Sequence, residues 1–361
     1  MDIVNRFLQP ALLWLCLVVP SVFSVQKFFG WPGVGGYAFV TALAVRALPR
    51  LWWKVSEREA LWFSLATFAA LGVIFAFAYP IANTHVPGMG SDDDDAMNIG
   101  VVELLHGHYP YYARTYLGNL IHHLPGAFLL AAPFVLLGTS ALQNLFWLAL
   151  FFIVLHRQLG SYTAALRWFW LMLLFSPIVL HQLITGTGHI TNAIYVMLGL
   201  WWLLNAEHKA LPAVAWGVAL SSRANFLLLL PLAFGWLAQR LGLKAAVGLS
   251  TLTCSVFAIL TLPFYFYDPQ GFAPLEAADR LTRFNDALPY AGSAIGIGTA
   301  LLSISLAWRP MQNSSSLWLN CALVQSFPVI AGYLLGRDLV FLTYGSFFLC
   351  FGIFAAAERN G

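Results

Sequence analysis

Four consecutive aspartates occupy positions 92–95, in a chain of which only 9% of the residues are charged. A carboxylate placed beside a hydroxyl group can take its proton as a general base, and a cation can stabilise a departing phosphate. Arg223 interrupts an apolar stretch, where a charge is expensive unless it has a partner or a function. Arg114 follows the aspartates in the same polar segment. These residue types are candidates for general-base catalysis and for binding an anion such as a phosphate.

The aspartate run stands where a helix should begin. The sequence predicts a helix over 91–106, with Ser91 as its N-cap, Asp94 in the capping-box position and Gly107 as its end. One or two carboxylates would complete such a start, whereas four adjacent carboxylates repel one another. A solvated helix cap that uses the whole run is the alternative, and it stays open.

The helical period assigns these aspartates to different faces. The apolar face of the helix is expected to contain Met97, Val101, Leu104 and Leu105. Asp92 and Asp95 lie opposite, whereas Asp94 falls on the apolar side and points toward the body of the protein. A carboxylate in that position needs a partner or a role. We therefore predict that Asp94 or an immediate neighbour is functional.

Aromatic and histidine side chains follow the aspartates in the same segment. Tyr109, Tyr111 and Tyr112 surround a proline and could form a rigid platform for a sugar ring; an aromatic belt at the membrane interface is the alternative. Five of the nine histidines also lie here, at positions 85, 106, 108, 122 and 123. With the aspartates they could ligate a divalent metal, but no ligand spacing defines a site, so no metal ligands and no cofactor are predicted.

Further polar groups lie in two later segments. Arg280 and Arg283 fall within 267–290 and would share one face if that stretch were helical, so both are candidates for binding a phosphate. A solvated helix face is the alternative. His189 follows a Gly-Thr-Gly turn and is expected to be structural. The four cysteines lie in apolar runs without metal-like spacing, which predicts neither a disulfide nor a zinc site.

The rest of the 361-residue chain is apolar enough to be read as membrane spans. Hydrophobic residues make up 60% of it, against about 45–50% in an average soluble domain. The net charge of +3 is too small and dispersed to indicate a nucleic-acid partner. Long apolar runs lie at about 8–26, 31–49, 59–79, 140–156, 162–182, 189–204, 210–221, 225–239, 244–266, 291–308, 317–335 and 338–357. They predict an all-α polytopic membrane protein with about 12 transmembrane helices.

The distribution of basic residues predicts how these spans are oriented. Basic loops should be cytoplasmic; they lie near residues 46–58, 157, 209, 240–244 and 309. The segments 80–123 and 267–290 then become outer loops. The alternation of sides holds if 124–138 is a re-entrant or interfacial helix; a short tilted span is the alternative. Residues 1–361 are therefore expected to form a single integral-membrane domain, with the proposed active site in 80–123.

Several motifs together resemble a known family. They are Ser-Asp-Asp-Asp-Asp-Ala-Met-Asn at 91–98, Gly-His-Tyr-Pro-Tyr-Tyr at 107–112, His-His-Leu-Pro-Gly-Ala at 122–127, Arg-Ala-Asn-Phe at 223–226, and the outer-loop stretches at 262–264 and 268–272. In this order they resemble the GT-C superfamily of integral-membrane glycosyltransferases, and most of all its bacterial polyprenol-phosphate mannosyltransferase-like branch.

The resemblance implies an enzyme of the bacterial plasma membrane. It would move a sugar from a polyprenyl-phosphate donor to a glycan or glycolipid acceptor on the outer, extracytoplasmic face. The family's catalytic acid maps onto the aspartate run, where the distance to Gly107 favours Asp94. Asp94 would then be the general base, with Asp92 or Asp95 as a second carboxylate. His122 and His123 fall in a substrate-binding motif. Two other functions stay open. They are a transporter or flippase of lipid-linked sugars, and a non-catalytic subunit of an envelope-assembly complex.

Overall fold

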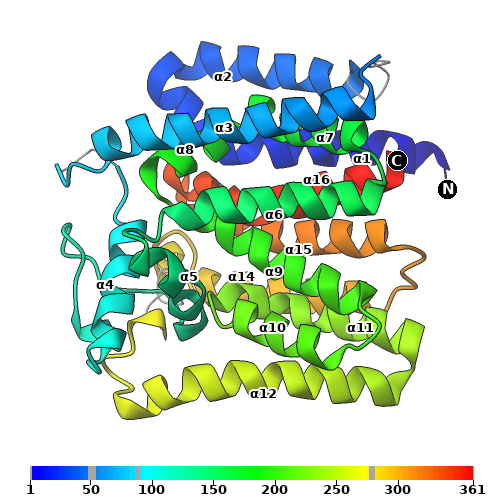
Figure 1. The fold of residues 1–361 in the computed structure, drawn as a ribbon. Helices are drawn as coiled ribbons and strands as arrows, with labels where there is room; N and C mark the ends of the chain where they lie inside the picture. The colour runs from blue at the N-terminus through cyan, green and yellow to red at the C-terminus, as the bar shows by residue number, and fades with distance from the viewer. Residues whose placement is uncertain (1, 48–53, 87–89, 276–280, 361) are drawn as a thin grey trace.

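The structure, a computed structural model, describes residues 2–47, 54–86, 90–275 and 281–360 (Figure 1). The α-helices are α1 (Asp2–Val18), α2 (Val22–Ala47), α3 (Glu57–Ala82), α4 (Asp93–Leu105), α5 (Pro125–Leu136), α6 (Leu142–Leu159), α7 (Tyr162–Phe175), α8 (Ile178–Thr185), α9 (His189–Asn205), α10 (Ala210–Leu220), α11 (Leu230–Leu241), α12 (Leu243–Tyr267), α14 (Ala291–Ala307), α15 (Ser314–Gly336) and α16 (Ser346–Asn360). Short 3-10 helices are η1 (Val19–Ser21), η3 (Pro110–Tyr112), η4 (Ala224–Leu229), η5 (Ala273–Leu275), η6 (Thr282–Asp286) and η7 (Leu339–Gly345). No β-strand occurs among these described residues, which confirms the predicted all-α class.

Among the described residues, seven helical segments are long and apolar enough to cross a membrane. They are Pro10–Ala47, Glu57–Ala82, Leu142–Leu159, Ala224–Leu241, Leu243–Tyr267, Ser314–Gly336 and Leu339–Arg359. α7 and α8 together would add an eighth, but they are bent by 77° relative to each other. The expected count of about twelve spans is not confirmed, because α10 and α14 have only 11 and 17 residues, and a span needs roughly 20.

The first of these segments folds back on itself at Gly30. The backbone of Gly30 has φ 64° and ψ −172°, which breaks the helix inside α2. Beyond the break, the chain returns along α1. Trp14 Nε1 donates to the Ala38 carbonyl at 2.7 Å, and the Tyr37 hydroxyl donates to the Leu17 carbonyl at 2.9 Å. The segment Pro10–Ala47 therefore consists of two antiparallel helical parts. They correspond to the two separate apolar runs that the sequence shows at about 8–26 and 31–49.

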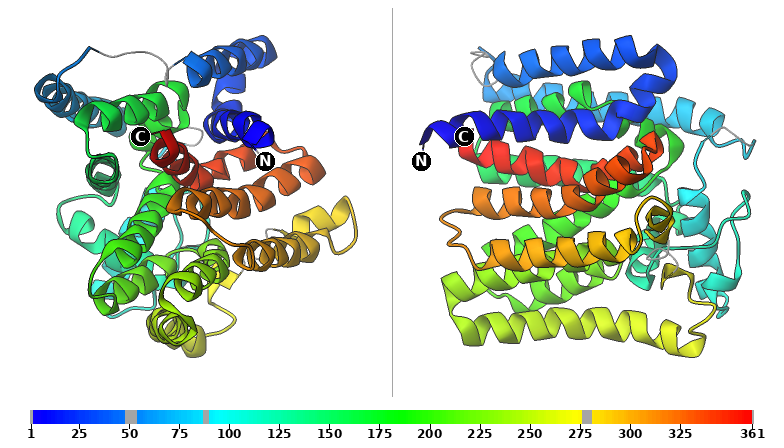
Figure 2. Two further views of the ribbon diagram at one scale, coloured as in Figure 1. Left: turned by 90° about the vertical axis from the view of Figure 1, so that its right-hand side faces the viewer. Right: turned by 180° about the vertical axis from the view of Figure 1, so that it is seen from behind.

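The two ends of the helical bundle differ in character. α4, α5 and the irregular segments around η3 gather at one end (the left in Figure 1), which we call the loop end. The connections after α6, after α9, between α11 and α12, and before α15 lie at the opposite end, which we call the basic end (Figures 1 and 2). The basic connections predicted to share one side therefore do lie together, away from the long polar segment.

Helix α5 is short and packs beneath α4. Its 12 residues are about 18 Å long, well short of the roughly 30 Å of a bilayer core. Met97 and Val101 of α4 share a buried apolar cluster with Phe128 of α5, whereas Leu105, expected in this face, is 59% exposed. A Cβ atom on Gly126 would lie 2.3 Å from the Val218 carbonyl oxygen, so glycine is needed for α5 to dock on α10. These dimensions agree with the predicted non-spanning segment.

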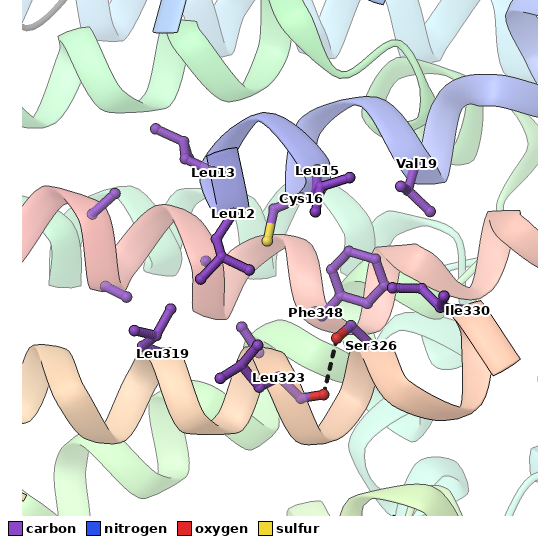
Figure 3. Close-up of a pocket in the computed structure, with 14 residues that line it drawn as sticks. Leu12, Leu13, Leu15, Cys16, Val19, Leu319, Leu323, Ser326, Ile330 and Phe348 are labelled. Carbon is purple, nitrogen blue, oxygen red and sulfur yellow. Dashed lines mark hydrogen bonds between the residues drawn. The ribbon is translucent and has the colours of Figure 1, made fainter. Parts of the chain in front are cut away.

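An apolar cavity of about 120 Å³ lies between α1, α15 and α16 (Figure 3). Cys16, Leu319 and Phe348 are among its lining residues, and Ser326 donates from its hydroxyl to the Leu323 carbonyl at 2.9 Å. Cys16 belongs to the buried core, and all four cysteines of the chain are free. The sequence-based prediction of no disulfide is therefore confirmed.

Candidate functional site

Asp93 and Arg223 form an ion pair between segments that are far apart in the sequence. Asp93 is the first residue of α4, and Arg223 lies in the break between α10 and η4. The Arg223 Nη2 atom donates to Asp93 Oδ1 at 2.7 Å. The Asp93 side chain is 14% exposed and the Arg223 side chain 15% exposed. The pair is thus largely sheltered from water but still has a face on the surface of the loop end.

Three further groups converge on Asp93. His123, just before α5, places Nε2 3.2 Å from Asp93 Oδ1 and 2.9 Å from Arg223 Nη2. The Gly188 main-chain N–H donates to Asp93 Oδ2 at 2.7 Å, and His189 Nε2 lies 4.0 Å from Oδ1. Four segments of the chain therefore meet at one carboxylate: the start of α4, the start of α5, the start of α9 and the α10–η4 break.

The guanidinium of Arg223 is also fixed from its other side. With its amide oxygen toward Arg223, Asn192 accepts from Nε at 2.6 Å while its amide nitrogen donates to the Tyr195 hydroxyl and the Gly188 carbonyl. The Phe347 ring lies 5.8 Å from the guanidinium carbon. A guanidinium held in this way presents a rigid fork of donors, the geometry that suits a phosphate.

The groups around Asp93 give its carboxyl a pKa that differs from that of an exposed aspartate. Burial alone would raise the pKa of the Asp93 carboxyl, but Arg223, His123 and His189 outweigh burial and hold this pKa well below its usual range. Burial and the charge of Arg223 lower the pKa of His123, against the opposing effect of Asp93. At neutral pH the site therefore contains an ionised Asp93, a charged Arg223 and a neutral His123.

Asp94 points into the protein, as the helical period predicted. It is 5% exposed, and the Tyr79 hydroxyl, which also lies 2.9 Å from Thr139 Oγ1, donates to Asp94 Oδ2 at 2.6 Å. A Cβ atom on Gly186 would lie 2.6 Å from the same carboxylate oxygen, so the turn before α9 fits around Asp94 only as glycine. Burial raises the pKa of Asp94 to about 6, helped by the charge of Asp93 and opposed by the bond from Tyr79.

Asp92 and Asp95 fasten the loop that follows α4. Asp92 Oδ2 accepts from Thr115 Oγ1 and from Asn119 Nδ2, both at 2.7 Å. Asp95 Oδ2 accepts from the Tyr116 main-chain N–H at 2.9 Å. Neither carboxylate is hydrogen-bonded to Asp93 or to Arg223. Their hydrogen bonds indicate a structural role in shaping the loop end.

The start of α4 differs from the prediction by one residue. Asp92, not Ser91, is the N-cap, and the Ser91 hydroxyl accepts from the Asp93 main-chain N–H at 3.2 Å. The predicted capping box does not form, because the carboxylate of Asp94 accepts from Tyr79 instead of reaching back to the cap. Partners contributed by distant segments thus override the local capping pattern.

The three tyrosines do not form one exposed platform. Tyr111 is 1% exposed, and its hydroxyl donates to the His123 carbonyl at 2.9 Å, so it supports His123 from within the core. Tyr109 is partly buried and donates to the Phe264 carbonyl. Tyr112 alone among them is exposed, at 61%, and donates to Asp268 Oδ2 at 3.0 Å. Burial therefore removes Tyr111 from direct contact with any substrate.

Other predicted binding residues lie apart from Asp93. Arg114 is exposed and donates to the Gly118 carbonyl at 3.0 Å. His122 Nδ1 lies 3.0 Å from the carbonyl oxygen of Ala273 in η5. Arg283, 45% exposed, lies 3.3 Å from Asp338 Oδ2. Arg280 lies outside the described residues. Of the predicted cations and histidines, the structure brings together Arg223 and His123.

The predicted histidine-rich loop does not assemble a metal site in the part of the chain that the structure describes, where no three His, Cys, Asp or Glu side chains are placed to hold one ion. His108 Nδ1 instead lies 2.9 Å from Glu103, and the His85 ring packs 4.8 Å from that of Tyr116. The positive charge that contacts the Asp93 carboxylate is the guanidinium of Arg223.

Sequence reasoning omitted two residues of this cluster. Asp93 was included only as an immediate neighbour of Asp94, because the helical period singled out Asp94 as the inward-facing carboxylate. His189 was expected to be structural, yet it lies beside Asp93. The available signal was the pair of glycines at 186 and 188, which permits the close approach of another segment.

Comparison with known proteins finds no matching family model, no matching curated protein and no matching solved structure. The resemblance to membrane glycosyltransferases therefore stays a prediction from the motifs.

Proposed function

We propose that this chain is a membrane glycosyltransferase that moves a sugar from a polyprenyl-phosphate donor to a hydroxyl of a glycan or glycolipid acceptor. The observation that supports the proposal is the contact between Asp93 and Arg223, a carboxylate and a guanidinium in one sheltered cluster. The apolar helices supply the environment that a prenyl chain requires, and the loop end supplies the polar site.

In the proposed reaction, Arg223 and His123 hold the donor phosphate. The acceptor hydroxyl gives its proton to a carboxylate as its oxygen forms a bond to the anomeric carbon of the sugar. The bond between that carbon and the phosphate oxygen breaks, and its electron pair stays on the phosphate. Arg223 stabilises the negative charge that develops there, which is worth roughly 100-fold or more in rate for a well-placed donor.

Accessibility to the acceptor hydroxyl favours Asp93 over Asp94 as the carboxylate that takes the proton. Asp93 is partly exposed, whereas Asp94 is buried and its carboxylate faces Tyr79 and the turn at Gly186. Before the donor binds, Arg223 is one of the neighbours that keep the pKa of Asp93 low. A donor phosphate competes for the same guanidinium, so its binding would raise the pKa of Asp93 and make it a better base. Asp94 would then position α4 through Tyr79.

The alternatives predict other distributions of polar groups. A flippase needs polar groups along a path between the two faces, whereas Asp93, Arg223, His123 and His189 gather at the loop end. A non-catalytic subunit would use the loop end as a docking surface and would not depend on a single carboxylate.

The test uses membrane vesicles that contain the full chain and a labelled polyprenyl-phosphate mannose. We expect Asp93→Asn to reduce transfer at least about 100-fold, whereas Asp94→Asn, which keeps an acceptor for Tyr79, should lower it only a few-fold. Glu103→Gln is the matched control, because Glu103 belongs to the same helix and contacts His108. Loss of transfer in Asp94→Asn with activity kept in Asp93→Asn would assign the base to Asp94. Full activity in both variants would contradict the enzymatic proposal.

A further inference from the structure

A second group of cations lies at the basic end, away from Asp93. A cavity of about 400 Å³ opens there between the end of α9, the last turns of α11 and the start of α15. Lys209 and Arg240 line it, and none of the described residues in its lining is acidic. The proposed sugar transfer makes no use of this cavity, so its residues need a separate explanation.

Both cations are held in place. Lys209 is partly buried, and its Nζ donates to three main-chain carbonyls at the end of α9, at 2.9–3.1 Å. Arg240 Nη2 donates to the Gln312 carbonyl at 2.6 Å, and its guanidinium carbon lies 4.7 Å from the centre of the Trp236 ring. Because these side chains are already ordered, an anion that binds them loses less conformational entropy than it would at freely moving cations.

The start of α15 forms another side of the cavity. Asn313 is the N-cap of this helix, and its side chain accepts from the Ser316 main-chain N–H at 3.0 Å. The positive end of the helix dipole adds to the charge of the two cations. One acid contacts this rim: the Glu358 carboxylate accepts from Ser314, which lines the cavity, and from Gln158 at 2.8 Å.

The side of the cavity formed by α9 and α11 is largely apolar apart from the two cations, whereas Gln312, Asn313 and Ser314 make the opposite side polar. Leu204, Leu237 and Leu241 lie beside the cations, together with the ring of Trp236. The cavity lies where the apolar span Ala224–Leu241 ends. Lipid phosphates occupy this level of a membrane, and cations near an anionic membrane surface each contribute attraction to them. The leucine side chains would contribute nothing to the binding of a soluble anion.

We propose that this cavity binds the phosphate headgroup of an anionic membrane lipid. The phosphate contacts Arg240, Lys209 adds its positive charge from the cavity wall while its three N–H groups stay on the carbonyls at the end of α9, and the acyl chains run past the exposed side chain of Leu241. The shared chemistry is a phosphate group, which a free anion also carries, so the experiment distinguishes the two sources.

The test measures which lipids the purified full chain retains. The protein is taken from vesicles of equal parts phosphatidylcholine and phosphatidylglycerol, and native mass spectrometry counts the lipids of each class. We expect a preference for phosphatidylglycerol that falls about fivefold in Arg240→Gln, the effect of one interfacial cation. Arg157→Gln is the matched control, because Arg157 is an exposed cation at the same end and does not line the cavity. It should keep the preference.

Three results would overturn the proposal: no preference in the unchanged protein, an equal loss in Arg157→Gln, or a preference kept in Arg240→Gln. A further arm uses phosphatidylcholine vesicles with millimolar inorganic phosphate. If phosphate alone raises the unfolding temperature as much as phosphatidylglycerol does, the ligand is a free anion and the lipid assignment is wrong. Lys209→Gln serves as a second variant, with circular dichroism to verify that α9 remains folded.

Discussion

The Arg223 Nη2 atom lies 2.7 Å from Asp93 Oδ1, across 130 positions of sequence. This contact ties the polar loop end to the break between α10 and α11. The two side chains are coupled, because each removes the cost of burying the other's charge.

The coupling predicts non-additive effects on stability. Arg223→Gln leaves Asp93 ionised without its main cation, so it should lower the free energy of unfolding by about 3 kcal/mol. Asp93→Asn/Arg223→Gln should recover part of that loss, because the uncompensated carboxylate is gone. Thermal or denaturant unfolding of the four proteins in detergent measures the cycle. Strictly additive changes would show that the two side chains do not interact.

Asp94 predicts a particular dependence of stability on pH. Burial raises its pKa in the folded protein to about 6, from an ordinary value of 3.8. Between these values the folded state binds more protons than the unfolded state, so the contribution of Asp94 to stability falls as pH rises from about 4 to about 6. Asp94→Asn removes this term. The variant should therefore gain unfolding temperature relative to the unchanged protein at pH 7.5 and lose that advantage at pH 4.5.

The comparison of Asp94→Asn with the unchanged protein isolates the contribution of Asp94 to the pH dependence of stability. His123, whose folded pKa is lowered, costs stability as pH falls below its ordinary value of 6.5, but it does so in both proteins. A difference in unfolding temperature that does not change with pH would mean that Asp94 has no raised pKa.

The all-α fold class and the inward direction of Asp94 could be predicted from sequence, but the contacts of Asp93 could not. Apolar periodicity identifies the helices, and the inward direction of Asp94 follows from the helical repeat. The partners of Asp93 could not be predicted, because Arg223, Gly188 and His189 reach it through tertiary contacts alone. The predicted number of spans is not confirmed, because α10 and α14 are apolar but have only 11 and 17 residues, a length that the hydropathy of the sequence does not define.

Gly186 offers a test of how tightly α4 fits against the turn before α9. Its φ is +71°, and an added Cβ would lie 2.6 Å from Asp94 Oδ2. Gly118 is the matched control, because its φ is +78° but nothing lies within 4 Å of an added Cβ. Gly118→Ala should cost only the backbone strain, about 1–2 kcal/mol. Gly186→Ala should lower the unfolding temperature further and reduce transfer; equal effects would show that α4 moves freely.

Tyr111 and Tyr112 should respond oppositely to substitution. Tyr111 is buried, so Tyr111→Ala leaves a cavity and an unpaired carbonyl on His123, and should cost about 3–5 kcal/mol of stability. Tyr112 is 61% exposed, so Tyr112→Ala should hardly change the unfolding temperature. If Tyr112 packs against a sugar, its loss should instead raise the KM for the donor or acceptor. Similar unfolding temperatures for the two variants would contradict this assignment.

The sequence separation between Asp93 and Arg223 also has a consequence for biosynthesis. At 5–20 residues per second, a ribosome needs roughly 7–25 s to make the intervening 130 residues. During that interval a nascent chain already carries Asp93 but lacks the arginine that pairs with it. The cluster around Asp93 can be completed only after α10 has been synthesised, so a translation product truncated before residue 223 would leave Asp93 without its guanidinium partner.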